Sequence, residues 1–192
     1  MKVLPLHDFC LHIGLRMRSI GCVLIVVVII HATYVPSSAQ PQNKKDSLKN
    51  IIASSTEKDT LYLRNLIDLA IVTRNEDMAQ SQAYFQEAIA LSKALGAYRF
   101  QVRSLNGLGI CYGMLDQYPE AIQNFSRALE LALKTGYPVY AGDSYNSLGI
   151  VYKRLGDYPV SLTLFGKALD IYDSLGNDQS AASCYENMGI LY

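Results

Sequence analysis

Two stretches of the chain carry nearly the same pattern, SLNGLGICY at residues 104–112 and SYNSLGIVY at residues 144–152. The match extends outward from these stretches at an offset of 40 residues: 12 of the 28 positions in 104–131 are identical to those in 144–171. Chance would give roughly two identities. A third copy begins near the end of the chain, where Tyr185, Gly189, Ile190 and Tyr192 recur at the same offset. Self-similarity at such a period predicts a stacked array of repeats.

Each period is predicted to hold two helices, because apolar residues recur at spacings of three and four. The first stripe is Leu105, Leu108, Tyr112 and Leu115, and the second is Ile122, Phe125, Ala128, Leu129 and Leu133. Pro119 and Pro159 suit the first turn of each second helix, where no amide partner is lost. Gly136 and Gly176 follow the second helices, where glycine readily adopts the left-handed conformation that ends a helix. Gly109 and Gly149 lie in mid-helix, which indicates close approach of a neighbouring helix.

This pattern resembles the tetratricopeptide repeat family, whose signature is a large apolar residue, Leu, Gly and Tyr, followed by Ala, Phe and Ala. Repeat 2 matches at Leu105, Leu108, Gly109, Tyr112, Ala121, Phe125 and Ala128. Repeat 3 matches at Tyr145, Leu148, Gly149, Tyr152, Phe165 and Ala168, with Ser161 where alanine is usual. Repeat 1 is degenerate and matches at Leu66, Leu69, Ala70, Phe85 and Ala88, with a turn one residue shorter. The resemblance implies an all-α fold, a right-handed superhelical α-solenoid of antiparallel helix pairs.

The resemblance also divides the chain. We expect a linker and short leading helix at 40–59, repeat 1 at 60–98, repeat 2 at 99–138, repeat 3 at 139–178 and the first helix of repeat 4 at 179–192. Leu48, Ile51 and Ile52 have helical spacing, so the leading helix is predicted within 43–55, where it would cover the apolar edge of repeat 1. Because the sequence ends inside repeat 4 without a polar cap, we expect a fragment of a longer protein. The alternative is a last helix that closes the array unaided or with a partner chain.

The first 39 residues have the features of a secretory signal peptide. Arg16 and Arg18 precede an unbroken apolar run at residues 20–30, and small residues ending in Ala39 follow it. We therefore expect cleavage after Ala39 and an exported, periplasmic or extracytoplasmic protein. The alternative is an uncleaved membrane anchor formed by residues 20–35. Met17 would make a tidier start for such a leader, so we hypothesise that it is the true initiator.

Composition argues against several kinds of chemistry. The chain has 17 basic and 17 acidic residues, which gives no electrostatic reason to expect nucleic acid as a partner. All three histidines lie in the first 31 residues, so histidine-based catalysis and histidine metal sites are excluded from the repeats. Cys111 and Cys184 are interpreted as buried thiols. No cofactor, metal site or catalytic residue is predicted.

A binding groove is nevertheless predicted, because stacked helix pairs of this family present their first helices on a concave surface. By the geometry of the family, the residues facing it are Arg103, Asn106, Ile110, Met114, Asp143, Asn146, Ile150, Lys153, Arg154, Ser183, Glu186 and Ile190. Asn106 and Asn146 recur one period apart, and a carboxamide can both donate to and accept from a peptide backbone. A second interpretation carries equal weight, that these asparagines hydrogen-bond between adjacent helices. Some family members grip a terminal carboxylate with a Lys and Asn pair, but Asn106 and Ile110 stand at those places here.

Three functions follow as hypotheses. The first is a non-catalytic scaffold that binds a protein or peptide partner in the groove, with membrane contact only through the leader or a downstream segment. The second is the extracytoplasmic sensor region of a longer signalling protein, a histidine kinase or transcriptional regulator, because exported arrays of this period resemble such regions. The third is an enzyme that uses the array to support a further domain. The sequence beyond Tyr192 would separate the three.

Overall fold

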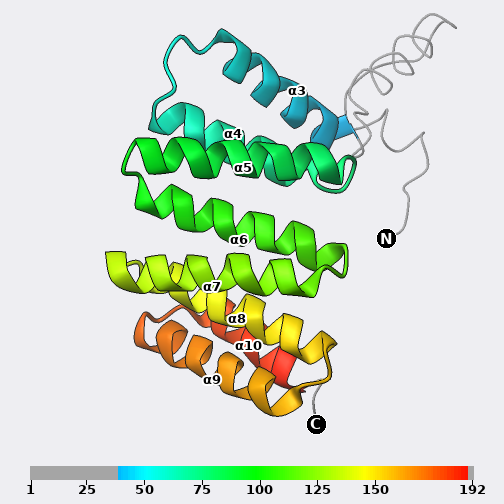
Figure 1. Cartoon of the computed structure of the whole chain (residues 1–192), viewed down its shortest axis with the longest axis vertical. Coiled ribbons are helices and arrows are strands. Elements are labelled where there is room, and N and C mark those ends of the chain that lie inside the picture. The colour runs from blue at the N-terminus through cyan, green and yellow to red at the C-terminus, as the bar shows by residue number, and fades with distance from the viewer. Residues whose placement is uncertain (1–38, 190–192) are drawn as a thin grey trace, which may run out of the picture. The chain divides into compact units, whose positions relative to one another are not determined.

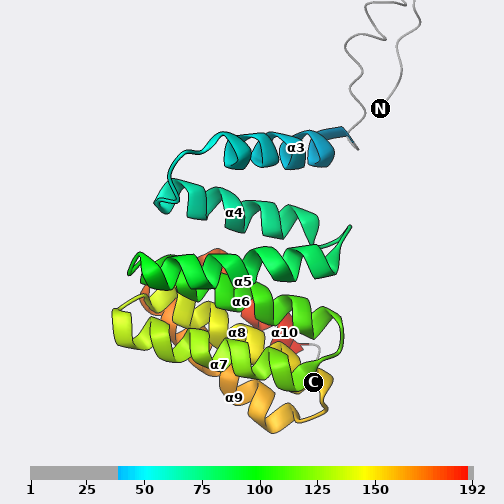
Figure 2. The ribbon, with the colours of Figure 1, turned by 45° about the horizontal axis from the view of Figure 1, so that its top comes forward.

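The computed structural model describes residues 39–189; residues 1–38, which form nearly all of the expected signal peptide, and residues 190–192 lie outside the described residues. The helices in chain order are α3 (Ala39–Ser54), α4 (Thr60–Thr73), α5 (Met78–Ala94), α6 (Tyr98–Met114), α7 (Tyr118–Thr135), α8 (Pro138–Arg154), α9 (Tyr158–Ser174) and α10 (Asp178–Gly189). From α4 to α10, each helix packs against the next one along the chain (Figure 1, with a turned view in Figure 2). The expected all-α solenoid is confirmed over these residues.

The helices group into the pairs α4–α5, α6–α7 and α8–α9, which we refer to as repeats 1, 2 and 3. The first helices of the pairs also contact one another, α4 with α6 and α6 with α8. They therefore form a continuous layer, with the second helices α5, α7 and α9 in the other layer. Within residues 39–189, no helix is both long and apolar enough to cross a membrane.

The turns follow from glycine and proline. Gly136 and Gly176 have φ values of 73° and 63° and end the second helices, as predicted. Pro119 and Pro159 lie in the first turns of α7 and α9, also as predicted. Asp116 is the only non-glycine residue with a positive φ, 57°, in the part of the chain that the structure describes.

Two residues of the predicted apolar stripes are not in the core. Leu115 is 45% exposed and Leu133 is 57% exposed. Leu115 comes after the end of α6 at Met114, where the chain turns away from the helix axis. Leu133 lies beside the buried face of α7, which runs through Phe125 and Ala128 to Ala132. The spacing of apolar residues gave the correct helices but misplaced these two side chains.

The core is built from rings of the second helices placed against glycines of the first helices. A Cβ added at Gly109 would lie 2.7 Å from the Phe125 ring, and one added at Gly149 would lie 2.6 Å from the Phe165 ring. Real Cβ atoms do not approach so closely, so only glycine fits. Gly107 of repeat 2 likewise meets Phe85 of repeat 1, so this kind of contact also joins adjacent repeats. The approach predicted for the mid-helix glycines is made by an aromatic ring.

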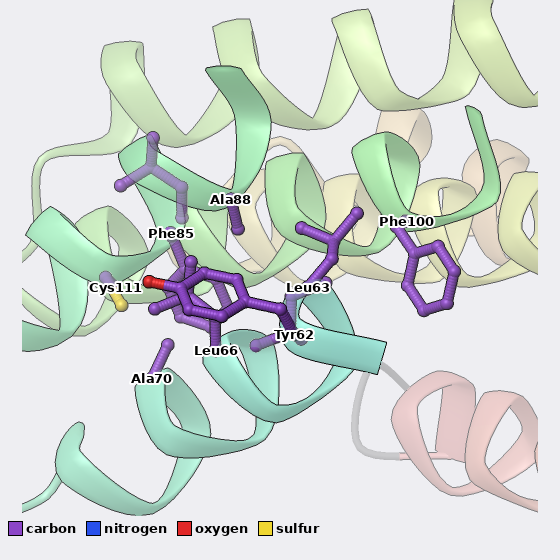
Figure 3. Close-up of a cluster of buried hydrophobic side chains, with 10 residues drawn as sticks. Tyr62, Leu63, Leu66, Ala70, Phe85, Ala88, Phe100 and Cys111 are labelled. Atoms are coloured by element: carbon purple, nitrogen blue, oxygen red, sulfur yellow. The ribbon is translucent and has the colours of Figure 1, made fainter. Parts of the chain in front are cut away.

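The largest cluster joins side chains of α4, α5 and α6 and includes Leu63, Leu66 and Phe85, which are at most 1% exposed (Figure 3). The leading helix α3 adds to it, because Ile52 packs against this cluster and Leu48 is itself buried. An ion pair between Lys45 and Glu76 links α3 to the turn between α4 and α5.

We expect the substitution Gly149→Ala to lower the free energy of unfolding by about 1–3 kcal/mol, because the fully buried Phe165 ring must shift to admit a methyl group. Gly166→Ala is the matched control. No atom lies within 4 Å of a Cβ placed there, so alanine should stabilise α9 by about 0.5–1 kcal/mol. Urea denaturation followed by circular dichroism measures both changes. Equal effects of the two substitutions would contradict this account of the core.

Candidate functional site: the concave face of the first helices

Two adjoining cavities open along the layer of first helices. The larger, of about 430 Å³, reaches from Arg74 at the end of α4 across α6 to α8. The smaller, of about 340 Å³, lies between α6 and α8. Both are lined by Ile110, Asn146 and Ser147. Together they make one groove that spans the three repeats, which we call the concave groove.

Most of the predicted site residues lie in this groove. Those lining one or both cavities are Arg103, Asn106, Ile110, Met114, Asp143, Asn146, Ile150 and Arg154. Lys153 and Glu186 line neither cavity: the Lys153 Nζ donates to Asn187 Oδ1 at 2.8 Å, and Glu186 is exposed on α10, as is Ser183. Ile190 lies outside the described residues.

The floor of the groove is apolar. Ile110 is 37% exposed and Met114 is 47% exposed, and Ile150 beside them is half-buried. Side chains of this size left accessible in a concave surface lose contact with water when a ligand covers them, which favours binding.

The two asparagines bridge the first helices of successive repeats. Asn106 of α6 lies 3.0 Å from the Ser144 hydroxyl of α8, and Asn146 of α8 lies 3.6 Å from the Cys184 thiol of α10. The two bridges span the same 38 positions, so they are equivalent contacts in successive repeats. Asn187 extends the second bridge, since its amide donates to Asn146 Oδ1 at 3.4 Å. Of the two interpretations of these asparagines, the structure favours hydrogen bonding between adjacent helices.

The first bridge also shows how little of Asn106 remains for a ligand. Asn106 is 8% exposed. The Ser144 hydroxyl has one proton and two neighbours, the Tyr140 carbonyl at 2.8 Å and the Asn106 side chain. If its proton goes to Tyr140, the Asn106 amide can turn and donate to the Ser144 oxygen, because a carboxamide can present either end. In either arrangement one end of Asn106 is committed to Ser144.

The charged residues of the groove are mostly paired. Arg103 Nη2 lies 2.7 Å from Asp68 Oδ1, and Arg154 Nη1 lies 3.7 Å from Asp116 Oδ1. Asp143 accepts a hydrogen bond of 2.8 Å from the Tyr172 hydroxyl. Burial raises the pKa of Asp143 above its ordinary value, and the bond from Tyr172 partly opposes this effect.

Both thiols are buried and free, as predicted. Burial raises the pKa of Cys111, whose sulfur lies 3.6 Å from the Ser81 hydroxyl. Burial, together with the nearby Asp143 and Asp173, raises the pKa of Cys184 to about 11. Both sulfurs are therefore protonated at neutral pH and lack the thiolate that nucleophilic chemistry needs.

The tetratricopeptide repeat model matches this sequence at residues 57–134 and 140–192. The chain belongs to the tetratricopeptide repeat family. No curated protein matches it in sequence. Tetratricopeptide repeats are general protein–protein interaction modules, and their scaffold is typically non-catalytic.

Several solved tetratricopeptide repeat structures are similar to the model. BtubC from P. vanneervenii has a TM-score of 0.65 and 17% identity, with 80% of this chain and 63% of that chain covered. The TPR domain of Arabidopsis FLU has a TM-score of 0.54 and 19% identity, with 58% and 95% covered. A signal transduction ATPase with a tetratricopeptide repeat sensor, from Pyrococcus horikoshii, has a TM-score of 0.59 and 15% identity, with 85% and 28% covered. The chain thus spans less than two thirds of the first and third proteins, and at these identities the likeness shows the fold alone.

Sequence reasoning missed the groove residues of the degenerate repeat 1. Ile71 and Arg74 line the larger cavity, yet no groove position was predicted on α4. The signal was present in the repeat itself. With a turn one residue shorter, Arg74 takes the place in its repeat that Lys153, a predicted groove residue, takes in repeat 3.

We expect Ser144→Ala to lower the free energy of unfolding by about 1 kcal/mol, because it leaves the buried Asn106 without its hydroxyl partner. Ser104→Ala is the matched control. Ser104 is equally buried but bonds only to the Phe100 carbonyl of its own helix, and Ile67 stands where repeat 1 would place the asparagine. Urea denaturation compares the two variants. The bridge has no energetic weight if Ser104→Ala costs as much as Ser144→Ala.

Proposed function

We propose that this chain is a non-catalytic scaffold that binds a peptide segment of a protein partner in the concave groove. The observation that supports this most strongly is the accessible apolar floor of the groove, where Ile110 and Met114 remain exposed inside cavities walled by α4, α6 and α8. Charged groups stand around this floor, with Arg103 and Asp143 on one side and Arg154 on the other. Apolar contacts with a few polar groups to fix orientation are the usual composition of a ligand site.

The bound segment makes its main contacts through side chains on this floor. Asn106 is largely committed to Ser144 and Asn146 to Cys184 and Asn187, so the asparagines are left with a smaller share in binding than the sequence suggested. Their bridges instead fix the spacing of the first helices, which keeps the floor preformed. A preformed site loses less conformational entropy when it binds.

The substitution Ile110→Glu tests this proposal, since it places a charge in the middle of the apolar floor. Peptides selected from a random library against the wild-type chain should bind this variant at least about tenfold more weakly, because a buried charge without a partner is costly. Leu133→Glu is the control, because Leu133 is exposed on α7 and lines neither groove cavity. Fluorescence anisotropy gives the affinities, and circular dichroism confirms the fold. A selection that yields no binding peptide, or peptides that bind both variants equally, would overturn the proposal.

The second candidate function is the extracytoplasmic sensor region of a longer signal-transduction protein. The basic and apolar leader supports it, and a signal transduction ATPase with a tetratricopeptide repeat sensor shares the fold. Both candidates use the same groove and differ in what the partner's binding controls.

Export of the protein is part of both candidates. We expect the mature protein to be recovered outside the cytoplasm with Gln40 as its first residue, because the small residues before it form a cleavage site. N-terminal sequencing of the purified protein measures this directly. A chain that stays in the membrane fraction and keeps residues 20–35 would instead show the anchored alternative, and an intact cytoplasmic chain would contradict export.

A further inference from the structure

Arg74 is a cation of the concave groove without a partner. It is half-buried at the end of α4 and lines the larger cavity. Its Nε is buried and has no hydrogen-bond partner among the described residues, and the ion pairs found there do not include Arg74. A buried donor left unpaired costs free energy that an acceptor would recover.

The other charged groups of the same cavity have partners. Arg103 is paired with Asp68, and the Asp143 carboxylate is held by the Tyr172 hydroxyl. Asp143 stands on α8, and α6 lies between it and α4, because α6 contacts both of these helices. The cavity therefore has an unpaired positive group on its α4 side and a partnered acidic group on its α8 side.

Apolar side chains lie next to Arg74 in this cavity. Ile71, on the same helix, and Ile110, on α6, are each 37% exposed and line it. The floor continues from Ile110 to Met114 and Ile150 in the adjoining cavity. A ligand that pairs with Arg74 would thus meet apolar surface at once.

We infer that Arg74 binds a carboxylate of the partner peptide, with an apolar side chain of the same peptide lying on Ile71 and Ile110. The inference rests on the proposed function and deepens it by specifying the class of peptide. A guanidinium binds a carboxylate with two parallel hydrogen bonds, which would give the buried Nε its missing acceptor. A carboxylate fits better than a doubly charged phosphate, because Asp143 in the same cavity repels added negative charge.

The test uses the full chain and peptides selected on it from a random library. Binding peptides should be enriched in Asp or Glu beside a Leu, Ile or Phe. Their affinity for Arg74→Gln should fall by about tenfold, because a charge-assisted hydrogen bond is lost. Arg64→Gln is the matched control, since Arg64 is exposed on the same helix and lines neither groove cavity. Replacing the acidic residue of the peptide by its amide should remove the difference between Arg74→Gln and wild type.

A further comparison identifies the source of the carboxylate. If amidation of the peptide C-terminus weakens binding to the wild-type chain but not to Arg74→Gln, Arg74 binds the terminal carboxylate; if it leaves binding unchanged, Arg74 binds a side-chain carboxylate. Thermal unfolding serves as the structural readout, and Arg74→Gln should melt no lower than wild type because it breaks no ion pair.

Peptides that lack acidic enrichment, or that bind Arg74→Gln within twofold of wild type while still losing affinity for Ile110→Glu, would overturn this inference and leave the proposed function in place. A selection that yields no groove-binding peptide would overturn both.

Discussion

The fold depends on the contact between a helical glycine and an aromatic ring of a second helix. Phe125 and Phe165 pack on Gly109 and Gly149 within their own repeats, and Phe85 packs on Gly107 of the next repeat. The ring occupies the space that a Cβ would take, so first and second helices approach closely at each of these points. Since the contact recurs with the 40-residue period, it orders the helices into two layers and places all the first helices in one of them.

The groove is a consequence of this layering. One side of each first helix is used against the rings, and part of the rest is used in bridges such as Asn106 with Ser144. What remains faces the cavities, and there the chain keeps Ile110 and Met114 exposed and Arg74 unpaired. These are the features that packing does not explain, and on them the proposal of a peptide ligand with a carboxylate depends.

The sequence predicted the parts of the structure that depend on period and on local backbone chemistry. The helix pairs, the left-handed glycines such as Gly136 and the proline at the start of α7 all follow from those signals. It could not decide the role of Asn106, because a carboxamide satisfies a ligand and a neighbouring helix equally well and only the position of Ser144 in space separates the two. It missed Arg74 because repeat 1 has diverged from the pattern. It misplaced Leu133, since an apolar residue at helical spacing can lie just outside the buried face of its helix.

The central claim is that the first helices, and not the second, form the binding surface. Nuclear magnetic resonance of isoleucine methyl groups tests it most directly, because each layer carries its own set. On titration with a selected peptide, the account predicts shifts at Ile71, Ile110 and Ile150, which line the groove, while Ile89, Ile122 and Ile171 on α5, α7 and α9 stay in place. Shifts confined to the second set would contradict it.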